Sequence, residues 1–389
     1  MKYVAISDLH LGQNGSDGSG QCSTLSSNPA IFPEGSLTRR KNFIVSVQEF
    51  ANGQKINLIL NGDAMDLSLA NMDFCIEELK RLISDLDCIA EVDYVVGNHD
   101  HHLWMQNCDE LYLKRPTPTY LPIYEPTLPR GNFSSFLAKR ISDVQWRLAY
   151  PIFNIDAHNG ERIIFTHGHL AGGLYTLFSR MLQPYIRQNY SGSYAAATIN
   201  IPITESIYWL LGKMGCEMGT EGIIEAVFSD IEQGKSSLAN ELVDRLVDSM
   251  FPDGLVKNFP DSWERGILKW AGKRLIKHFV AKNRTRTASM TRYQDDGTTV
   301  QEMSEWVCRN SGSWTGVFQE EGTNILVSGH THTIIQKDKI LPGKMKPNVE
   351  YLNLGSWLIE PGQPNPQSAA LFIDDSPDVL SYRMRRFNK

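Results

Sequence analysis

Residues 3–10 read YVAISDLH, an apolar run that ends in Asp8 and His10. Such a run is typical of a buried β-strand whose carboxyl end carries polar side chains. The same pattern, an apolar run followed by polar residues, recurs at residues 56–63 (INLILNGD) and 92–100 (VDYVVGNHD). Open sheets bind ligands at the carboxyl ends of their strands, so these stretches predict one site built from several strand ends.

Helical patterns separate these predicted strands. Apolar residues recur at helical spacing between Ser36 and Phe50, and again between Cys75 and Leu86. The order strand, helix, strand, helix, strand predicts a parallel, layered sheet and an α/β fold class. Later apolar runs predict further strands at 163–165, 325–327, 351–354 and 370–373, two of them ending in loops that carry His.

Three stretches interrupt this core pattern. Residues 13–35 are rich in Gly, Ser, Asn and Pro, which predicts a long loop, and the proline-rich residues 111–136 predict an extended surface excursion. Residues 175–315 change to long helical patterns and predict a mainly helical insertion. The core is then formed by residues 1–174 and 316–389.

The composition of the whole chain excludes several classes of protein. A length of 389 residues with 41% hydrophobic and 21% charged residues is ordinary for a globular protein, and a formal charge of −6 disfavours a nucleic-acid binder. No apolar run is long enough to span a bilayer, and the first residues lack the pattern of a secretory signal. Six cysteines without a CxxC pair favour reduced thiols, so we expect a cytoplasmic protein.

Five short motifs, each after a predicted strand, carry side chains that bind metals. Taken singly, each is more often a surface or core feature, but their common position at strand ends makes coincidence improbable. They are Asp8-Leu9-His10, Gly62-Asp63-Ala64-Met65-Asp66, Gly97-Asn98-His99-Asp100, His167-Gly168-His169 and Gly329-His330-Thr331-His332.

In this order the motifs resemble those of the calcineurin-like metallophosphoesterase superfamily, whose series runs DxH, GDxxD, GNH(D/E), H and GHxH. The resemblance covers residues 1–170 and 323–389 and leaves out the insertion. It implies a sandwich of sheets flanked by helices and a metal-dependent phosphoesterase activity.

The resemblance also implies the ligands of two divalent metals. One metal is expected on Asp8, His10, Asp63 and His332, and the other on Asp63, Asn98, His167 and His330. Imidazole and carboxylate ligands suit Mn, Fe, Zn or Ni, of which we favour Mn. Such a pair of cations clamps a phosphoryl oxygen and makes hydroxide available as the nucleophile.

Two further residues are expected to act in catalysis. In the superfamily, the position of His99 faces the substrate, where an imidazole can protonate the leaving oxygen. Asp66 matches a carboxylate that orients this imidazole, although a helix N-cap is an equal alternative. His169 is interpreted either as lining the metal pocket or as structural. His101, His102, His158 and His278 are interpreted as ordinary.

Differences from individual branches of the superfamily limit the range of expected substrates. Leu67 follows Asp66 where protein Ser/Thr phosphatases carry a phosphate-binding Arg, which disfavours a protein phosphatase. UDP-diacylglucosamine pyrophosphatases typically place Arg at the position of His99, and repair exonucleases carry additional domains. We therefore expect hydrolysis of phosphomonoester, phosphodiester or pyrophosphate bonds in a small or lipid-linked molecule. The alternatives are a DNA-processing nuclease and a non-catalytic metal-binding scaffold.

The insertion contains a basic amphipathic segment at residues 264–292. Apolar residues lie at helical spacing from Ile267 to Val280, and Lys269, Lys273 and Arg274 are among the basic residues between them. Such a helix binds an anionic membrane surface or a phosphorylated ligand, and the alternative is a solvated helix whose apolar side packs on the core. Because the insertion begins and ends beside the metal motifs, it is expected to cap the site.

Overall fold

The computed structural model describes most of the core and parts of the insertion. The described residues are 1–12, 22–26, 36–68, 70–113, 132–171, 201, 204–205, 209, 237–250, 263, 265–267, 269–270, 272–274, 303, 318, 323–340, 348–359, 367–377 and 380–387. Their elements are β1 (Lys2–Ile6), β2 (Cys22–Ser23), α1 (Ser36–Ala51), β3 (Ile56–Asn61), α2 (Met72–Asp85), β4 (Ile89–Val95), α3 (His101–Leu113), β5 (Asn132–Phe133), α4 (Ser135–Arg140), β6 (Gln145–Ala149), β7 (Ile152–Asp156), β8 (Arg162–Thr166), a 3-10 turn (His169–Ala171), α8 (Ser237–Met250), β9 (Thr323–Ser328), β10 (Ile334–Ile340), β11 (Asn348–Leu354), β12 (Leu358–Ile359), β13 (Ala369–Asp375) and β14 (Leu380–Arg386).

Two sheets form the centre of the described part. The larger sheet has seven strands in the order β14-β13-β1-β3-β4-β6-β5, and the smaller has five in the order β10-β11-β9-β8-β7. Strands β1, β3, β4 and β6 run parallel, as do β8, β9 and β11. The predicted parallel sheet is therefore confirmed at the centre, while antiparallel strands close both sheets at their edges.

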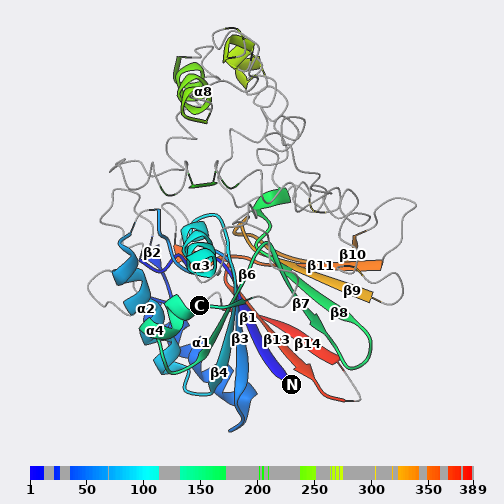
Figure 1. Cartoon of the computed structure of the whole chain (residues 1–389). Coiled ribbons are helices and arrows are strands. Elements are labelled where there is room, and N and C mark those ends of the chain that lie inside the picture. The colour runs from blue at the N-terminus through cyan, green and yellow to red at the C-terminus, as the bar shows by residue number, and fades with distance from the viewer. Residues whose placement is uncertain are drawn as a thin grey trace.

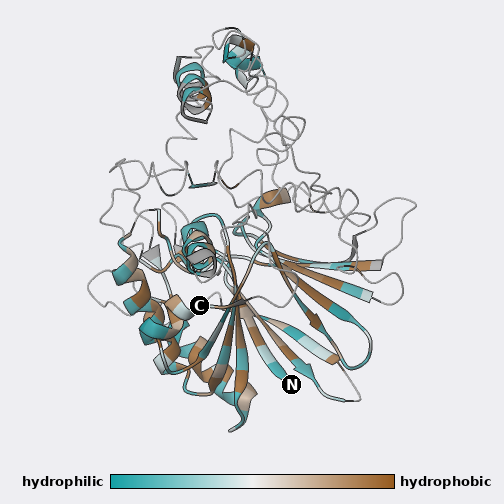
Figure 2. Ribbon diagram, in the orientation of Figure 1, coloured by the Kyte–Doolittle hydropathy of each residue, from teal (hydrophilic) through white to brown (hydrophobic). Residues whose placement is uncertain are grey.

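The alternation of side chains along the strands produces three layers. In β1, Val4 and Ile6 pack toward the helices, whereas Ala5 packs toward the smaller sheet. Helices α1, α2 and α4 lie on one side of the larger sheet and the smaller sheet lies on the other (Figure 1). Hydrophobic residues run along the strands of both sheets (Figure 2). The predicted α/β sandwich flanked by helices is confirmed.

Two loop predictions were wrong in part. Cys22 and Ser23, inside the predicted loop 13–35, form β2, which pairs with β12. Helix α3 continues to Leu113, and β5 and α4 begin before the predicted excursion 111–136 ends. The partner of β2 lies more than 300 residues away (Ser23 with Leu358), so local composition could not indicate the pairing. The prolines of the excursion lie outside the described residues.

The predicted insertion is described only in part. Helix α8 and every described position between 263 and 274 are helical. The rest of the predicted insertion, and with it the role of a cap, lies outside the described residues. In the described parts of the chain, no helix combines the length and apolarity needed to cross a membrane.

Candidate metal centre

The carboxyl ends of five strands deliver the candidate ligands. Parallel strands β1, β3 and β4 end at one edge of the larger sheet, and β8 and β9 end at the corresponding edge of the smaller one. Each is followed directly by one of the five motifs. Strand pairing, which fixes these ends side by side, thus brings together residues separated by more than 300 positions, such as His10 and His332.

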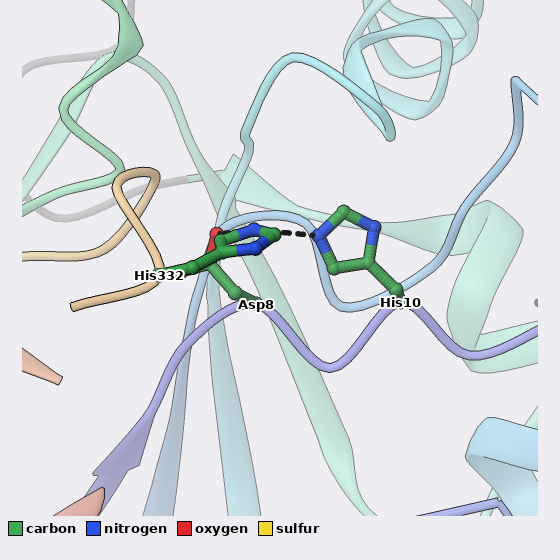
Figure 3. A group of neighbouring side chains, drawn as sticks. All are labelled: Asp8, His10 and His332. Carbon is green, nitrogen blue, oxygen red and sulfur yellow. Dashed lines mark hydrogen bonds and ion pairs between the residues drawn. The ribbon is translucent and has the colours of Figure 1, made fainter. Parts of the chain in front are cut away.

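The first group of ligands comes from the loop after β1 and the loop after β9. The ligand atoms of Asp8, His10 and His332 lie within 4.8 Å of one another, and all three side chains are buried. Nε2 of His332 lies 3.3 Å from Asp8 Oδ1 and 3.3 Å from His10 Nε2. Figure 3 shows the three side chains turned toward one another.

The second group contains Asp63, His167 and His330, whose ligand atoms also lie within 4.8 Å of one another. Nε2 of His167 is 3.0 Å from Asp63 Oδ2 and 3.0 Å from Asn98 Oδ1. Asp63 Oδ2 is also 4.0 Å from His10 Nε2 in the first group. The Asp63 carboxylate therefore lies between the two groups, where one side chain can contact two cations.

The surroundings of His167 suit a cation. Its Nδ1 lies 3.2 Å from the carbonyl oxygen of Asn61, which can only accept, so Nδ1 carries a proton. Nε2 then faces two acceptor oxygens, Oδ2 of Asp63 and Oδ1 of Asn98. Because an unprotonated Nε2 would be repelled by both oxygens, a positive charge must lie between them. Burial lowers the pKa of His167, but Asp63 and Asp8 outweigh it and raise the pKa to about 9. A metal ion would supply the same charge, with the imidazole held through its other nitrogen.

The backbone of the ligand loops is strained. Asp8, His10, Asp63, His330 and His332 all have positive φ angles between 47° and 70°. This left-handed conformation costs on the order of 1 kcal/mol or more for each residue that is not Gly, and it concentrates at functional sites. Backbone hydrogen bonds hold it in place: Asp8 donates to Gly62 O (3.0 Å) and His10 donates to Asp63 O (2.9 Å).

Glycine is required where these loops approach one another. A Cβ on Gly62 would overlap the ring of His167, and Gly62 also has a φ of +86°. A Cβ on Gly97 would overlap the carboxylate of Asp63. The glycines of the GD and GN motifs therefore make room for ligands on neighbouring strands.

His99 and Asp66 form a hydrogen-bonded pair beside the first group. Asp66 Oδ2 lies 3.0 Å from His99 Nδ1 and 3.1 Å from His10 Nδ1, so one carboxylate orients both rings. Burial opposes ionisation of Asp66, but His99 and His10 hold its pKa well below the usual range. The alternative interpretation of Asp66 as a helix N-cap is wrong, because Asn71 caps α2.

Asp100 has a structural role that the sequence patterns did not indicate. Its buried carboxylate accepts hydrogen bonds from the backbone of Ala64 (2.9 Å) and Gly97 (2.6 Å) and from the hydroxyl of Tyr94 (2.6 Å). It thereby ties the GDxxD loop to the GNHD loop. Burial and the neighbouring Asp63 raise its pKa to about 7. The only sign of this role in the sequence was the position of Asp100 at the end of the GNHD motif.

His101 and His102, interpreted as ordinary, connect the core to the insertion. Their Nδ1 atoms lie 2.5 Å and 2.8 Å from the two carboxylate oxygens of Glu205. The ring of His102 also stacks on Trp209, with 3.6 Å between centroids and 4° between planes. No motif pointed to Glu205, because its partners lie about 100 positions earlier in the chain.

The remaining histidines have distinct surroundings. His169 is buried beside His167, with ring centroids 5.4 Å apart, and burial followed by the charge of His167 lowers its pKa well below the usual value. His158 lies 2.9 Å from Asp375, away from the ligands. His278 lies outside the described residues.

One of three comparisons with known proteins identifies the family of this chain. Among solved structures, the chain aligns with a dimetal phosphatase from Danio rerio at a TM-score of 0.34 and 11% identity, over 100% of this chain and 98% of the other. That score is too low to support an argument, and no curated protein matches the chain. A family model described as calcineurin-like phosphoesterase matches residues 1–195, half of the 389 residues. The chain therefore belongs to the calcineurin-like phosphoesterase family and is a metal-dependent phosphoesterase.

Proposed function

We propose that the protein hydrolyses a phosphomonoester, phosphodiester or pyrophosphate bond of a small or lipid-linked molecule, with two divalent metals in the candidate centre. The observation that carries the proposal is the position of Asp63 between two groups of buried ligands. When bound, two cations polarise phosphoryl oxygens and make hydroxide available near neutral pH.

Backbone N–H groups hold two of the proposed ligand carboxylates in place. Asp63 Oδ1 accepts the backbone N–H of His99 (2.8 Å), and both oxygens of Asp8 are 3.0 Å from the backbone nitrogen of His330. The carboxylates are thus fixed before any ligand arrives, which lowers the cost of reorganisation during the reaction.

His99 is the proposed proton donor to the leaving oxygen. With Nδ1 directed at Asp66 Oδ2 (3.0 Å), its Nε2 is the atom from which a proton can leave. Asp66 also stabilises the imidazolium form, because its own carboxylate stays ionised. Asp66 therefore acts through His99 and is a positioning residue.

The donor set supports a transition metal. Imidazole nitrogens, carboxylate oxygens and the Asn98 carbonyl are intermediate between the all-oxygen sites of Mg and Ca and the thiolate sites of Zn. We propose Mn as the working metal, with Fe, Zn or Ni as alternatives. Leu67 is fully buried and supplies no cation beside Asp66, which supports a substrate other than a phosphoprotein.

Metal reconstitution tests the proposal. Protein stripped with a chelator should hydrolyse neither p-nitrophenyl phosphate nor bis-p-nitrophenyl phosphate, and added Mn should restore turnover of at least one of them. Comparing the two esters distinguishes monoesterase from diesterase activity, and a panel of nucleotides, sugar nucleotides and phospholipids then identifies the substrate. Protein that binds Mn but turns over none of these compounds would be the non-catalytic scaffold instead.

A further inference from the structure

One side of the helical segment 263–274 faces helix α8. Lys269 Nζ lies 2.8 Å from Asp248, and Lys273 Nζ lies 2.6 Å from Asp244. A Cβ on Gly272 would come within 2.8 Å of Val243 Cγ1, so the two helices are in close contact there. Lys269 and Lys273, which the sequence suggested for an anionic ligand, are thus already paired with carboxylates.

The opposite side of this segment is apolar and exposed. Trp263, Ile267 and Trp270 expose 62%, 46% and 60% of their surface. At about 3.6 residues per turn, they and Arg274 fall within roughly 60° of one another, with Gly272 on the far side of the helix. The guanidinium of Arg274 lies 5.2 Å from the centroid of the Trp270 ring. We call these four residues the tryptophan stripe.

We propose that the tryptophan stripe binds the interface of an anionic phospholipid bilayer. Tryptophan is favoured at membrane interfaces, where its ring is apolar and its N–H remains hydrated. Arg274 supplies positive charge on the stripe itself, and the stripe contains no acidic residue. The charge therefore complements anionic headgroups.

The size of the stripe favours a bilayer over a second protein. A stable protein interface buries about 800 Å² on each partner, whereas a stripe about 16 Å long with three apolar side chains offers far less. Shallow insertion into a bilayer needs only a few such side chains and gives weak, reversible binding.

The position of the segment also suits a membrane contact. In Figure 1, α8 and the yellow-green segment beside it lie at the end of the molecule beyond the carboxyl ends of the parallel strands, away from the N-terminus. Ile267, one of the apolar residues in the amphipathic pattern, is exposed here and does not pack on the core. The proposal does not depend on the substrate or on catalysis.

Vesicle co-sedimentation of the full chain tests the proposal. The protein should bind vesicles of phosphatidylglycerol and phosphatidylcholine, and Trp263→Ala/Trp270→Ala should lower the partition constant at least about tenfold. Arg274→Glu should weaken binding to these vesicles several-fold and change binding to pure phosphatidylcholine little. Phe133→Ala is the matched control, because Phe133 is an equally exposed aromatic residue (61%) that lies outside the stripe, in β5 of the larger sheet.

The possible results distinguish membrane binding by the stripe from a protein interface. Loss of binding in the double variant, with the control unchanged and hydrolysis of a small aryl phosphate retained, supports the stripe as a membrane contact. Absence of vesicle binding by the native chain, or equal binding by the double variant, overturns the proposal. A change of oligomeric state in the double variant would instead identify a protein interface and would also overturn it.

Discussion

At the scale of single residues, the site depends on how tightly the Asp63 carboxylate is enclosed. Asp63 contacts His167 (3.0 Å) and accepts the backbone N–H of His99 (2.8 Å). Gly97 lies so close that any side chain there would displace the carboxylate. An error of about 1 Å in such a group can cost on the order of a hundredfold in rate.

The first prediction is that Gly97→Ala lowers turnover of aryl phosphates by about a hundredfold and weakens metal binding, because the new methyl group overlaps Asp63. Gly266→Ala is the control, since no atom lies within 4 Å of the Cβ it would add. Steady-state kinetics and metal titration of both variants check this. Equal activity of the two variants would mean that Asp63 is not fixed as described.

The second prediction concerns His99, the proposed proton donor. His99→Ala should keep its metals, yet slow esters with poor leaving groups about a hundredfold more than p-nitrophenyl esters, which need little protonation. His158→Ala, a half-exposed histidine away from the ligands, should behave like the native protein. Losses of the same size on both kinds of ester would remove His99 from the role of general acid.

At the scale of elements, the first turn of α3 joins the GNHD loop to the predicted insertion. His101 and His102 begin the helix directly after the GNHD loop, and both contact Glu205. A carboxylate at the amino end of a helix is also favoured by the helix dipole. Burial raises the pKa of Glu205, but the hydrogen bonds from His101 and His102 outweigh this and lower it to about 2.

The third prediction follows from that pKa. Because the folded pKa lies below the unfolded value of about 4.3, Glu205 stabilises the fold above about pH 4, and the contribution is lost as the pH falls toward 2. Glu205→Gln should lower the free energy of unfolding at pH 7 by up to about 3 kcal/mol. Urea unfolding from pH 7 to pH 3 should show this difference shrinking below pH 4.

Glu161→Gln is the control for that measurement, because the Glu161 carboxylate accepts a hydrogen bond from the Asn159 side chain within its own turn. It should leave the free energy of unfolding nearly unchanged. If Glu205→Gln were no more destabilising than Glu161→Gln, the contact between α3 and the insertion would carry no stability.

The elements differ in how far the sequence predicts them. Alternating and helical apolar patterns are local, so β1, β3, α1 and α2 were predicted within a few residues. The pairing of β2 with β12 and the contact of Glu205 with α3 depend on residues distant in the chain, and no local pattern reports them. Asp100 was visible inside a motif, but its role depends on the loop after β3, which it holds.

At the scale of the whole molecule, two sheets share one site. The inner faces of both sheets form a common apolar core, with Ala5 and Ile59 from one sheet and Phe165 and Val327 from the other. That core fixes the distance between the strand ends, and thereby the distance between the two groups of ligands. All seven predicted ligands lie in these two groups or, in the case of Asn98, within 3.0 Å of a member.

If Asp63 binds two cations at once, as proposed, its replacement by Asn should release both, so the metal content of Asp63→Asn is decisive. Elemental analysis should find two metals per native chain and a loss of both in the variant, together with the loss of phosphoester turnover. Asp156→Asn, which removes an exposed carboxylate paired with Arg162, should keep both metals and full activity. Retention of both metals and of full activity by Asp63→Asn would mean that this carboxylate does not bridge two cations.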